Sequence, residues 1–160
     1  MGSGKTSIAK KLSTMLRKKF VDTDTTISNK TGVDINYIFD VEGEAGFRKR
    51  EEAALKECVL EKNIVLSTGG GIVLSANNRL RLKNHGVVVY LETSVESQEM
   101  RTLSNHNRPL LKNTEHKKTL QELMLTRGRL YEAIADITIK TDDKSLEEVA
   151  TEVGSKINEH

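Results

Sequence analysis

The chain contains one cysteine and one proline among its 160 residues, and it has no long apolar run. A single cysteine, Cys58, excludes an internal disulfide and fits a reducing compartment. No apolar segment reaches the roughly 18 residues that a membrane helix requires, and no signal peptide is visible. These features predict one cytoplasmic domain spanning residues 1–160.

The chain also lacks a large net charge, because its 25 basic and 23 acidic residues leave a net charge of only +2. That balance gives no support to nucleic acid or membrane partners. The four histidines are scattered without metal-ligand spacing, and Cys58 lies in a helical pattern typical of a packed, inert thiol. Metal chemistry based on histidine and cysteine is therefore not indicated.

What the sequence does have is a glycine-rich run at its start, "MGSGKTS". Residues 2–6 match the last five positions of the phosphate-binding P-loop signature G-x-x-x-x-G-K-[ST]. In such a loop, backbone N–H groups and the amino end of the next helix surround phosphate oxygens. Lys5 would then reach the β- and γ-phosphates of a nucleotide, and Thr6 would offer a hydroxyl to Mg²⁺. A surface turn with the same spelling is the alternative.

The opening glycine of this signature and the strand that normally precedes it are absent from the sequence. We expect that the sequence starts downstream of the natural start or that the chain was cut. The sequence alone does not decide between the two.

Strand and helix patterns alternate along the rest of the chain. Helical spacing covers residues 6–18, 24–30, 34–43, 44–61, 77–84, 94–101, 117–134 and 145–157. Extended patterns cover "KFVDTD", "NIVLSTGGG", "GVVVYLE" and "DITIK". The run "GVVVYLE" is apolar without alternation, which predicts a strand covered on both faces. We predict an α/β fold: a three-layer sandwich around a central parallel sheet.

Polar residues follow the predicted strands where ligands bind in parallel sheets. Asp22 and Asp24 flank Thr23 at one strand end, and extended alternation would place both carboxylates on one side. One could complete a magnesium shell, and the other could orient a hydroxyl nucleophile. A helix cap is the simpler reading for one of them. Another strand ends in three consecutive glycines, which either form a flexible turn or let a small ligand approach the backbone.

Three arginines are candidates for holding anions, namely Arg48, Arg108 and Arg127. Arg48 lies between Glu44 and Glu51, so a solvated helix face with ion pairs remains an alternative. Arg108 lies in the polar segment "TLSNHNRPLLKNTEH", residues 102–116, which suits a mobile lid over a nucleotide. An ordinary surface connection would explain that segment as well.

The segments GSGKT, "DTDTTI", "IFDVEGEAGFRKREE", "LSTGGGIV", "NRPLL" and "TRGRLY" occur in the order typical of the family that this chain resembles, the shikimate kinases. The resemblance runs from Gly2 to about Ala150. It implies a P-loop kinase architecture of the nucleoside monophosphate kinase type, and transfer of the γ-phosphoryl of ATP to the 3-hydroxyl of shikimate. It further implies a cytoplasmic monomer in chorismate and aromatic amino-acid biosynthesis, with ATP and Mg²⁺ as cofactors.

The resemblance also implies roles for individual residues. Catalysis would depend on Lys5, Asp24 and Arg108, and the magnesium shell on Thr6 and Asp22. Shikimate would be bound by Asp24, Arg48, Gly69, Gly70, Gly71 and Arg127. ATP would be bound by Gly2, Ser3, Gly4, Lys5, Thr6, Ser7, Arg101 and Arg108, with Arg101 against the adenine. The proline that the family often places on the other side of the adenine has no counterpart at Lys144, Ser145 and Leu146.

Two alternatives stay open on sequence grounds. Gluconate kinases and nucleotide kinases share the P-loop, lid and layout, although Arg48 in "GFRKRE" together with "TGGG" favours a carboxylated ring. A non-catalytic protein is the second alternative, because a sheet without its central strand would lose stability comparable to the ~5–15 kcal/mol of a whole domain.

Overall fold

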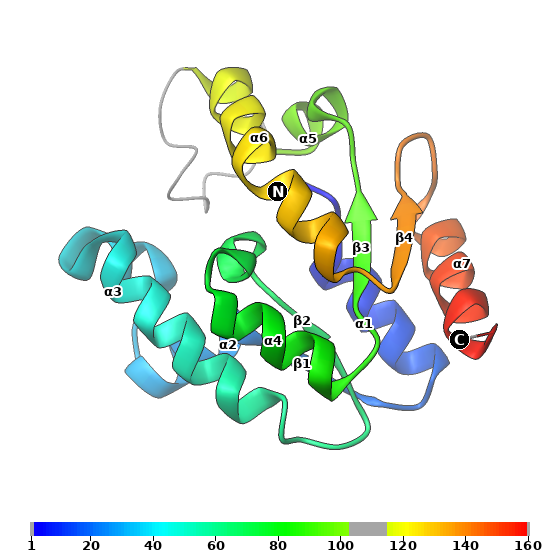
Figure 1. Ribbon diagram of the computed structural model, residues 1–160, viewed down its shortest axis with the longest axis horizontal. Coiled ribbons are helices and arrows are strands. Elements are labelled where there is room, and N and C mark those ends of the chain that lie inside the picture. Colours follow the sequence, from blue (N-terminus) through cyan, green and yellow to red (C-terminus); the bar gives the residue numbers. More distant parts are fainter. Residues whose placement is uncertain (1, 103–114, 160) are drawn as a thin grey trace.

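The protein was analysed as a computed structural model that describes residues 2–102 and 115–159. Helices and parallel strands alternate along the chain (Figure 1). The strands are β1 (Lys19–Asp22), β2 (Ile64–Ser67), β3 (Val89–Glu92) and β4 (Ile137–Lys140). The helices are α1 (Lys5–Met15), α2 (Thr23–Thr31), α3 (Ile35–Cys58), the 3₁₀ helix η1 (Gly70–Leu74), α4 (Ala76–His85), α5 (Val95–Thr102), α6 (His116–Ile134) and α7 (Leu146–Glu159).

Local sequence explains how the helices before the site begin and bend. The Asp22 carboxylate accepts hydrogen bonds from the backbone N–H groups of Asp24 and Thr25, so it caps α2. Asp34 caps α3 in the same way through the N–H of Tyr37. Gly43 has φ 69°, a left-handed conformation that suits glycine, and it breaks α3 into two helical parts. The two helical patterns predicted over 34–43 and 44–61 meet at this break.

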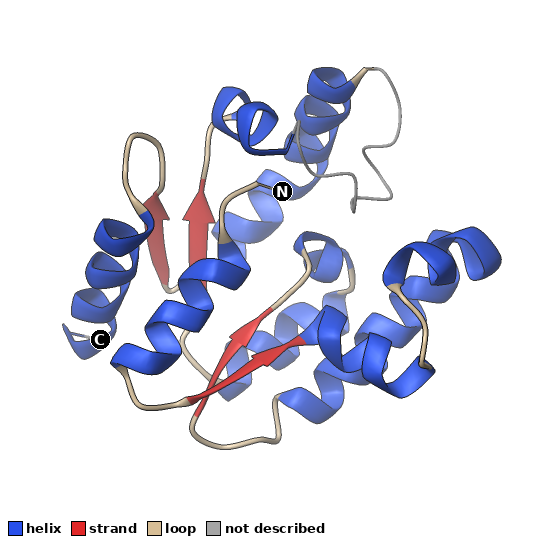
Figure 2. Cartoon of the chain, turned by 180° about the vertical axis from the view of Figure 1, so that it is seen from behind, coloured by secondary structure: helices blue, strands red, loops and turns tan. Residues whose placement is uncertain are grey.

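The strands form two separate parallel pairs, β1 with β2 and β3 with β4 (Figure 2). In the first pair Lys19 lies opposite Ile64 and Asp22 opposite Ser67. In the second pair Val89 lies opposite Ile137 and Glu92 opposite Lys140. Within the described residues no strand pairing joins β2 to β3, so the predicted parallel sheet is divided into two halves.

A cleft of about 740 Å³ lies between the two halves. Its lining is mainly apolar and includes Ile8 and Leu12 of α1, Leu66 of β2, and Leu91 of β3. All four residues of β3 are partly exposed. This exposure comes from the edge toward β2, which is unpaired and borders the cleft. Both faces are covered as predicted, since Val89 and Leu91 pack against the core of α1 and α7 and the Tyr90 ring stacks on Tyr131.

Helices cover both halves and form the core. On one side α1 and α7 pack on β4, and Ile8, Leu12, Ile139 and Val153 are buried there. On the other side α3, η1 and α6 meet around Leu55, Ile72, Val73 and Ile134. A third cluster joins α2 to α3 through Ile27, Ile38, Phe47 and Ala54. Cys58 is buried and free, as predicted, and burial raises the pKa of its thiol.

The end of β1 and the lengths of the helices bear on two further predictions. The extended segment "KFVDTD" is shorter than predicted, since β1 ends at Asp22 and Asp24 lies in the first turn of α2. The alternation argument for Asp22 and Asp24 is therefore wrong, because capping by Asp22 starts the helix one residue later. None of the described helices is long and apolar enough to cross a membrane.

Candidate active site

The glycine-rich start of the chain forms a loop that leads into α1. Gly2 and Gly4 have φ values of 67° and 79°, a left-handed backbone that other residues rarely adopt. Gly4 is the N-cap of α1, and no side chain caps the helix. The first N–H groups of a helix lack acceptors within it and carry the positive end of its dipole. Lys5 opens this helix, and its Nζ lies 3.3 Å from Ser3 Oγ. The loop and Lys5 can therefore hold an anion such as a phosphate.

Oxygen atoms from three elements gather beside this loop. Thr6 Oγ1 lies 3.4 Å from Asp22 Oδ2 and 3.5 Å from Ser67 Oγ. The other oxygen of Asp22 caps α2, so the carboxylate is held with Oδ2 toward Thr6. Hydroxyl and carboxylate oxygens are the ligands that Mg²⁺ takes in phosphate-transfer sites. The donor set therefore fits a magnesium ion, although the described residues contain no cluster of three or more His, Cys, Asp or Glu side chains that could hold a metal.

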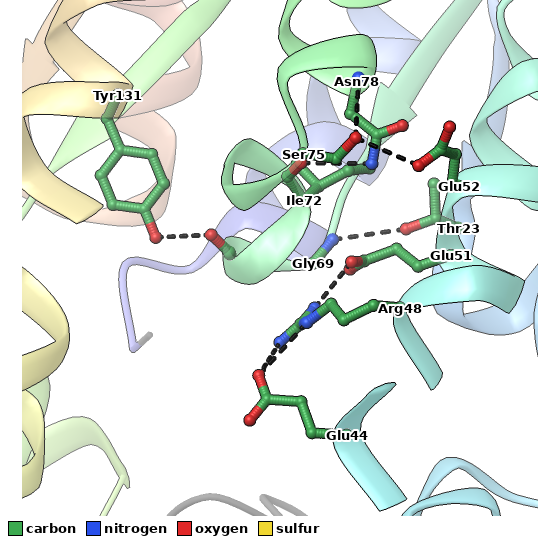
Figure 3. Close-up of polar contacts among 11 residues, drawn as sticks. Thr23, Glu44, Arg48, Glu51, Glu52, Gly69, Ile72, Ser75, Asn78 and Tyr131 are labelled. Atoms are coloured by element: carbon green, nitrogen blue, oxygen red, sulfur yellow. Dashed lines mark hydrogen bonds and ion pairs between the residues drawn. The ribbon is translucent and has the colours of Figure 1, made fainter. Parts of the chain in front are cut away.

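The glycine turn, Gly69 to Gly71, follows β2 and is an ordered feature. The Gly69 N–H donates to Thr23 Oγ1 at 3.3 Å, and the Tyr131 hydroxyl donates to the Gly70 carbonyl at 2.6 Å (Figure 3). A Cβ at Gly71 would lie 2.2 Å from Arg48 Nη2, so a side chain there would displace the Arg48 guanidinium. The reading as a flexible turn is wrong, since η1 begins at Gly70 and both flanks are hydrogen-bonded.

Arg48 reaches this turn from α3 and is held by two carboxylates. Its Nη1 donates to Glu51 Oε2 at 2.6 Å, and its Nη2 donates to Glu44 Oε1 at 3.0 Å (Figure 3). Burial lowers the pKa of Arg48, but these ion pairs outweigh it and leave the pKa above its ordinary value. Burial raises the pKa of the Glu51 carboxyl; Arg48 opposes the rise, and the nearby Asp24 carboxylate adds to it.

Arg127 of α6 approaches the same turn from the other side. Its side chain is only 4% exposed, and its Nη1 lies 4.0 Å from where a Cβ of Gly70 would be. Among the described residues no carboxylate lies within ion-pair distance of this guanidinium. A buried guanidinium without a carboxylate partner favours binding of an anion from outside the chain. Arg48 and Arg127 thus converge on consecutive glycines of one turn.

The remaining predicted residues lie beside the loop before α1 or outside the described residues. Arg101 of α5 donates to the Gly2 carbonyl at 3.4 Å and to the Thr141 carbonyl at 3.0 Å. It therefore joins the loop before α1 to the segment after β4. Arg108 lies outside the described residues, as do residues 103–114 of the predicted lid. Thr102 and His116, the first and last residues of the predicted lid, are in contact, with 2.7 Å between Thr102 Oγ1 and His116 Nε2.

Sequence reasoning gave no site role to Glu51, Thr23 or Tyr131, which contact Arg48 or the glycine turn. The alternative of a solvated helix face does not hold for Glu51, which is 1% exposed and faces inward with Phe47 and Leu55. The helical spacing of 47, 51 and 55 carries that signal, because the three positions share one face. Tyr131 lies one turn after Arg127 on α6, but its contact with Gly70 spans 61 positions and has no local signature.

Comparison with known proteins bears directly on this arrangement. The family model described as "Shikimate kinase" matches residues 1–158. The chain belongs to the shikimate kinase family. A shikimate kinase of Vibrio cholerae is 48% identical over 160 residues, which are the whole of this chain and 92% of the relative.

Solved shikimate kinases share the fold as well. One from Acinetobacter baumannii, in complex with shikimate, superposes with a TM-score of 0.97 at 42% identity. The match covers 99% of this chain and 89% of that one. Another, from Aquifex aeolicus, gives a TM-score of 0.85 at 33% identity over 99% of this chain and 92% of that one. The α/β P-loop kinase architecture predicted from the sequence is thereby confirmed.

Proposed function

We propose that the protein transfers the γ-phosphoryl of ATP to the 3-hydroxyl of shikimate, giving shikimate 3-phosphate and ADP. The observation that carries this proposal is the convergence of Arg48 and Arg127 on consecutive glycines of one turn. Two guanidinium groups beside one turn suit one carboxylate, which planar forks bind in bidentate fashion. The glycines between them leave room for a ring against the backbone. The reaction belongs to chorismate and aromatic amino-acid biosynthesis.

The nucleotide end would be formed by the loop and the start of α1. Backbone N–H groups of Gly2 to Ser7 surround the phosphates, and the Lys5 ammonium stabilises charge on the transferring group. Arg101 would pack against the adenine, since it already spans the loop and the segment after β4. Arg108, in the lid, would reach the transferring phosphate.

Thr6 and Asp22 would hold Mg²⁺, which neutralises phosphate charge when it is bound. Supporting this assignment, the Asp22 carboxylate is oriented by its hydrogen bonds to α2 before any ion arrives. Asp24 would orient the 3-hydroxyl and accept its proton. It lies in the first turn of α2, on the same side of the glycine turn as Glu51. Because phosphoryl transfer passes through a loose transition state, alignment matters more here than the strength of the base.

We propose further that the enzyme works in the cytoplasm as a monomer, with small molecules as its partners and neither nucleic acid nor a membrane. The balanced charge and the free, buried Cys58 are consistent with that setting.

The test compares ATP consumption with shikimate, gluconate and AMP side by side. We expect ADP release with shikimate alone, and a product phosphorylated at the 3-position by NMR. Turnover of gluconate or AMP at a comparable kcat/KM, with none of shikimate, would overturn the proposal. A related acid that lacks the 3-hydroxyl serves as the control, because it can bind but cannot accept the phosphoryl group.

A further inference from the structure

Tyr131 connects three parts of the molecule that are far apart in sequence. It lies on α6, and its hydroxyl donates to the Gly70 carbonyl at 2.6 Å (Figure 3). Its ring stacks on Tyr90 of β3, with 5.1 Å between the ring centroids and 25° between their planes. One side chain therefore ties the glycine turn after β2 to the other half of the divided sheet.

The glycine turn is held at successive points from opposite sides. Thr23 of α2 accepts from the N–H of Gly69, and Asn78 of α4 donates to the carbonyl of Ile72 at 3.2 Å. Tyr131 contacts Gly70, which lies between these two positions. Of the three contacts, this one comes from α6, the helix that bears Arg127. The space around the turn is tight, since a Cβ at Gly70 would lie 3.1 Å from Tyr131 Oη.

The turn must stay at a fixed distance from both guanidinium groups if a single small acid is to contact all three. Arg48 is fixed by Glu44 and Glu51, and Arg127 is fixed by its burial on α6. The Tyr131 hydrogen bond joins α6 to the turn, and it lies one helical turn from Arg127. Burial raises the pKa of the Tyr131 phenol, despite the opposing effect of Arg127, so the hydroxyl keeps its proton and remains a donor at working pH.

We propose that Tyr131 is a positioning residue for shikimate binding: its hydroxyl sets the glycine turn at the spacing from Arg127 that the ring and carboxylate of the substrate need. This inference rests on the proposed binding site at Arg48, Arg127 and the glycine turn. Tyr131 acts through Gly70 and needs no contact with the reacting atoms.

The first test is Tyr131→Phe, which removes one oxygen and keeps the stacked ring. We expect the Kd and KM for shikimate to rise roughly three- to tenfold, as for the loss of one neutral hydrogen bond, with the KM for ATP within twofold of wild type. Tyr90→Phe is the matched control. Among the described residues the Tyr90 hydroxyl has no hydrogen bond, so this variant should retain all three constants. An unchanged Kd for shikimate in Tyr131→Phe overturns the proposal, and so does an equal rise for ATP.

A double-mutant cycle with Gly70→Ala tests the contact itself. The added Cβ would crowd Tyr131 Oη at 3.1 Å, and loss of the hydroxyl relieves that crowding. The effects of Gly70→Ala and Tyr131→Phe on shikimate affinity should therefore be strongly less than additive. Additive effects would contradict the proposal.

Hydrogen exchange gives a readout if Gly70→Ala fails to fold. In Tyr131→Phe the amides of residues 69–72 should exchange faster than in wild type, while those of α1 stay unchanged. Equal rates at 69–72 would again overturn the proposal.

Arg127→Lys separates failure of the Tyr131 proposal from failure of the proposed shikimate site. If Arg127→Lys weakens shikimate binding and Tyr131→Phe does not, only the role of Tyr131 is wrong. If neither variant weakens it, the proposed binding site is wrong.

Discussion

Arg48 and Glu51 form an ion pair of 2.6 Å in which the carboxylate is 1% exposed and the guanidinium 22% exposed. Both members reach the glycine turn, since a Cβ at Gly69 would lie 2.8 Å from Glu51 Oε1 and one at Gly71 would lie 2.2 Å from Arg48 Nη2. Glu44 holds the same guanidinium from the solvent side. The two carboxylates therefore orient the Arg48 guanidinium toward the proposed shikimate site in the free protein. Less side-chain entropy is then lost when the ligand binds.

The two arginines should be sensitive to the shape of the cation as well as to its charge. We expect Arg48→Lys and Arg127→Lys each to raise the KM for shikimate about tenfold or more, because lysine keeps the charge and loses the planar fork. The KM for ATP should stay near its wild-type value. Arg50→Lys is the matched control, since Arg50 pairs with Glu42 on the exposed side of α3. A KM for shikimate that is unchanged in both variants would remove these arginines from the site.

The carboxylate of the substrate can be tested from the ligand side. A shikimate analogue whose carboxylate is replaced by a neutral group should lose roughly 10⁴ in kcat/KM, since a site built for hydrogen-bonded groups rejects ligands that lack them. Steady-state kinetics with both compounds measure this ratio. A loss of less than tenfold would mean that the guanidinium groups serve another ligand.

Lys5 should act on the chemical step. We expect Lys5→Ala to lower kcat by roughly 10²–10³, the typical loss for removal of one preorganised donor to developing charge. Lys10→Ala is the control on the same helix, because the Lys10 ammonium lies over the Phe20 ring, 5.6 Å from its centroid. If both variants keep wild-type kcat, the loop before α1 is not a phosphate site.

Asp22 should control the magnesium requirement without greatly changing stability. Asn is also a good helix cap, so Asp22→Asn keeps α2 capped while it removes the charge next to Thr6. We expect the Mg²⁺ concentration for half-maximal rate to rise about 10–100-fold. Asp34→Asn, the same change at the cap of α3, is the control and should leave the Mg²⁺ requirement unchanged. A parallel response of the two variants would point to a purely structural effect.

Glu51 should make stability depend on pH. Burial raises the pKa of this carboxyl in the folded protein above its ordinary value of 4.5, against the pull of Arg48 and with the repulsion of Asp24. The stabilising contribution of the protonated form is present below about pH 4.5 and is lost as pH rises through the raised pKa. Glu51→Gln, which does not titrate, should lack this loss above pH 4.5 in thermal melts. Glu44→Gln leaves Glu51 in place and should show the same loss of stability as wild type when the pH rises. If melting temperature depends on pH equally in wild type and both variants, Glu51 is not the source of the loss.

Local patterns predicted the order and type of the elements well, because helical spacing and caps depend on residues close together in sequence. The break at Gly43 and the helix bearing Arg127 are examples. Positions that depend on distant contacts were harder to predict. Alternation placed Asp24 on an extended segment with Asp22, whereas the capping alternative, which the sequence also allowed for one of the two, is the one that Asp22 follows. Glu51 looked like a surface acid, since its burial results from the packing of α3 against the glycine turn.

The resemblance to a family supplied what spacing could not, namely the pairing of Arg48 with Arg127 across 79 positions. The sequence already indicated a sheet without the strand that normally precedes the P-loop, but it did not indicate that β2 and β3 would be the strands left unpaired. The strands were each identified, but their pairing depends on which edges meet in space, and a run of apolar residues does not encode that.

The unpaired inner edges of β2 and β3 affect how the protein opens. Within the described chain, main-chain hydrogen bonds join strands inside each pair, and the two pairs are linked through side chains of α1 and α6. Val65 of β2 and Leu91 of β3 pack against the same core cluster of α1 and α7, so hydrogen-exchange protection of both pairs should depend on that shared core. A ligand held at once by Arg48, the glycine turn and Arg127 would add a second link between the two pairs.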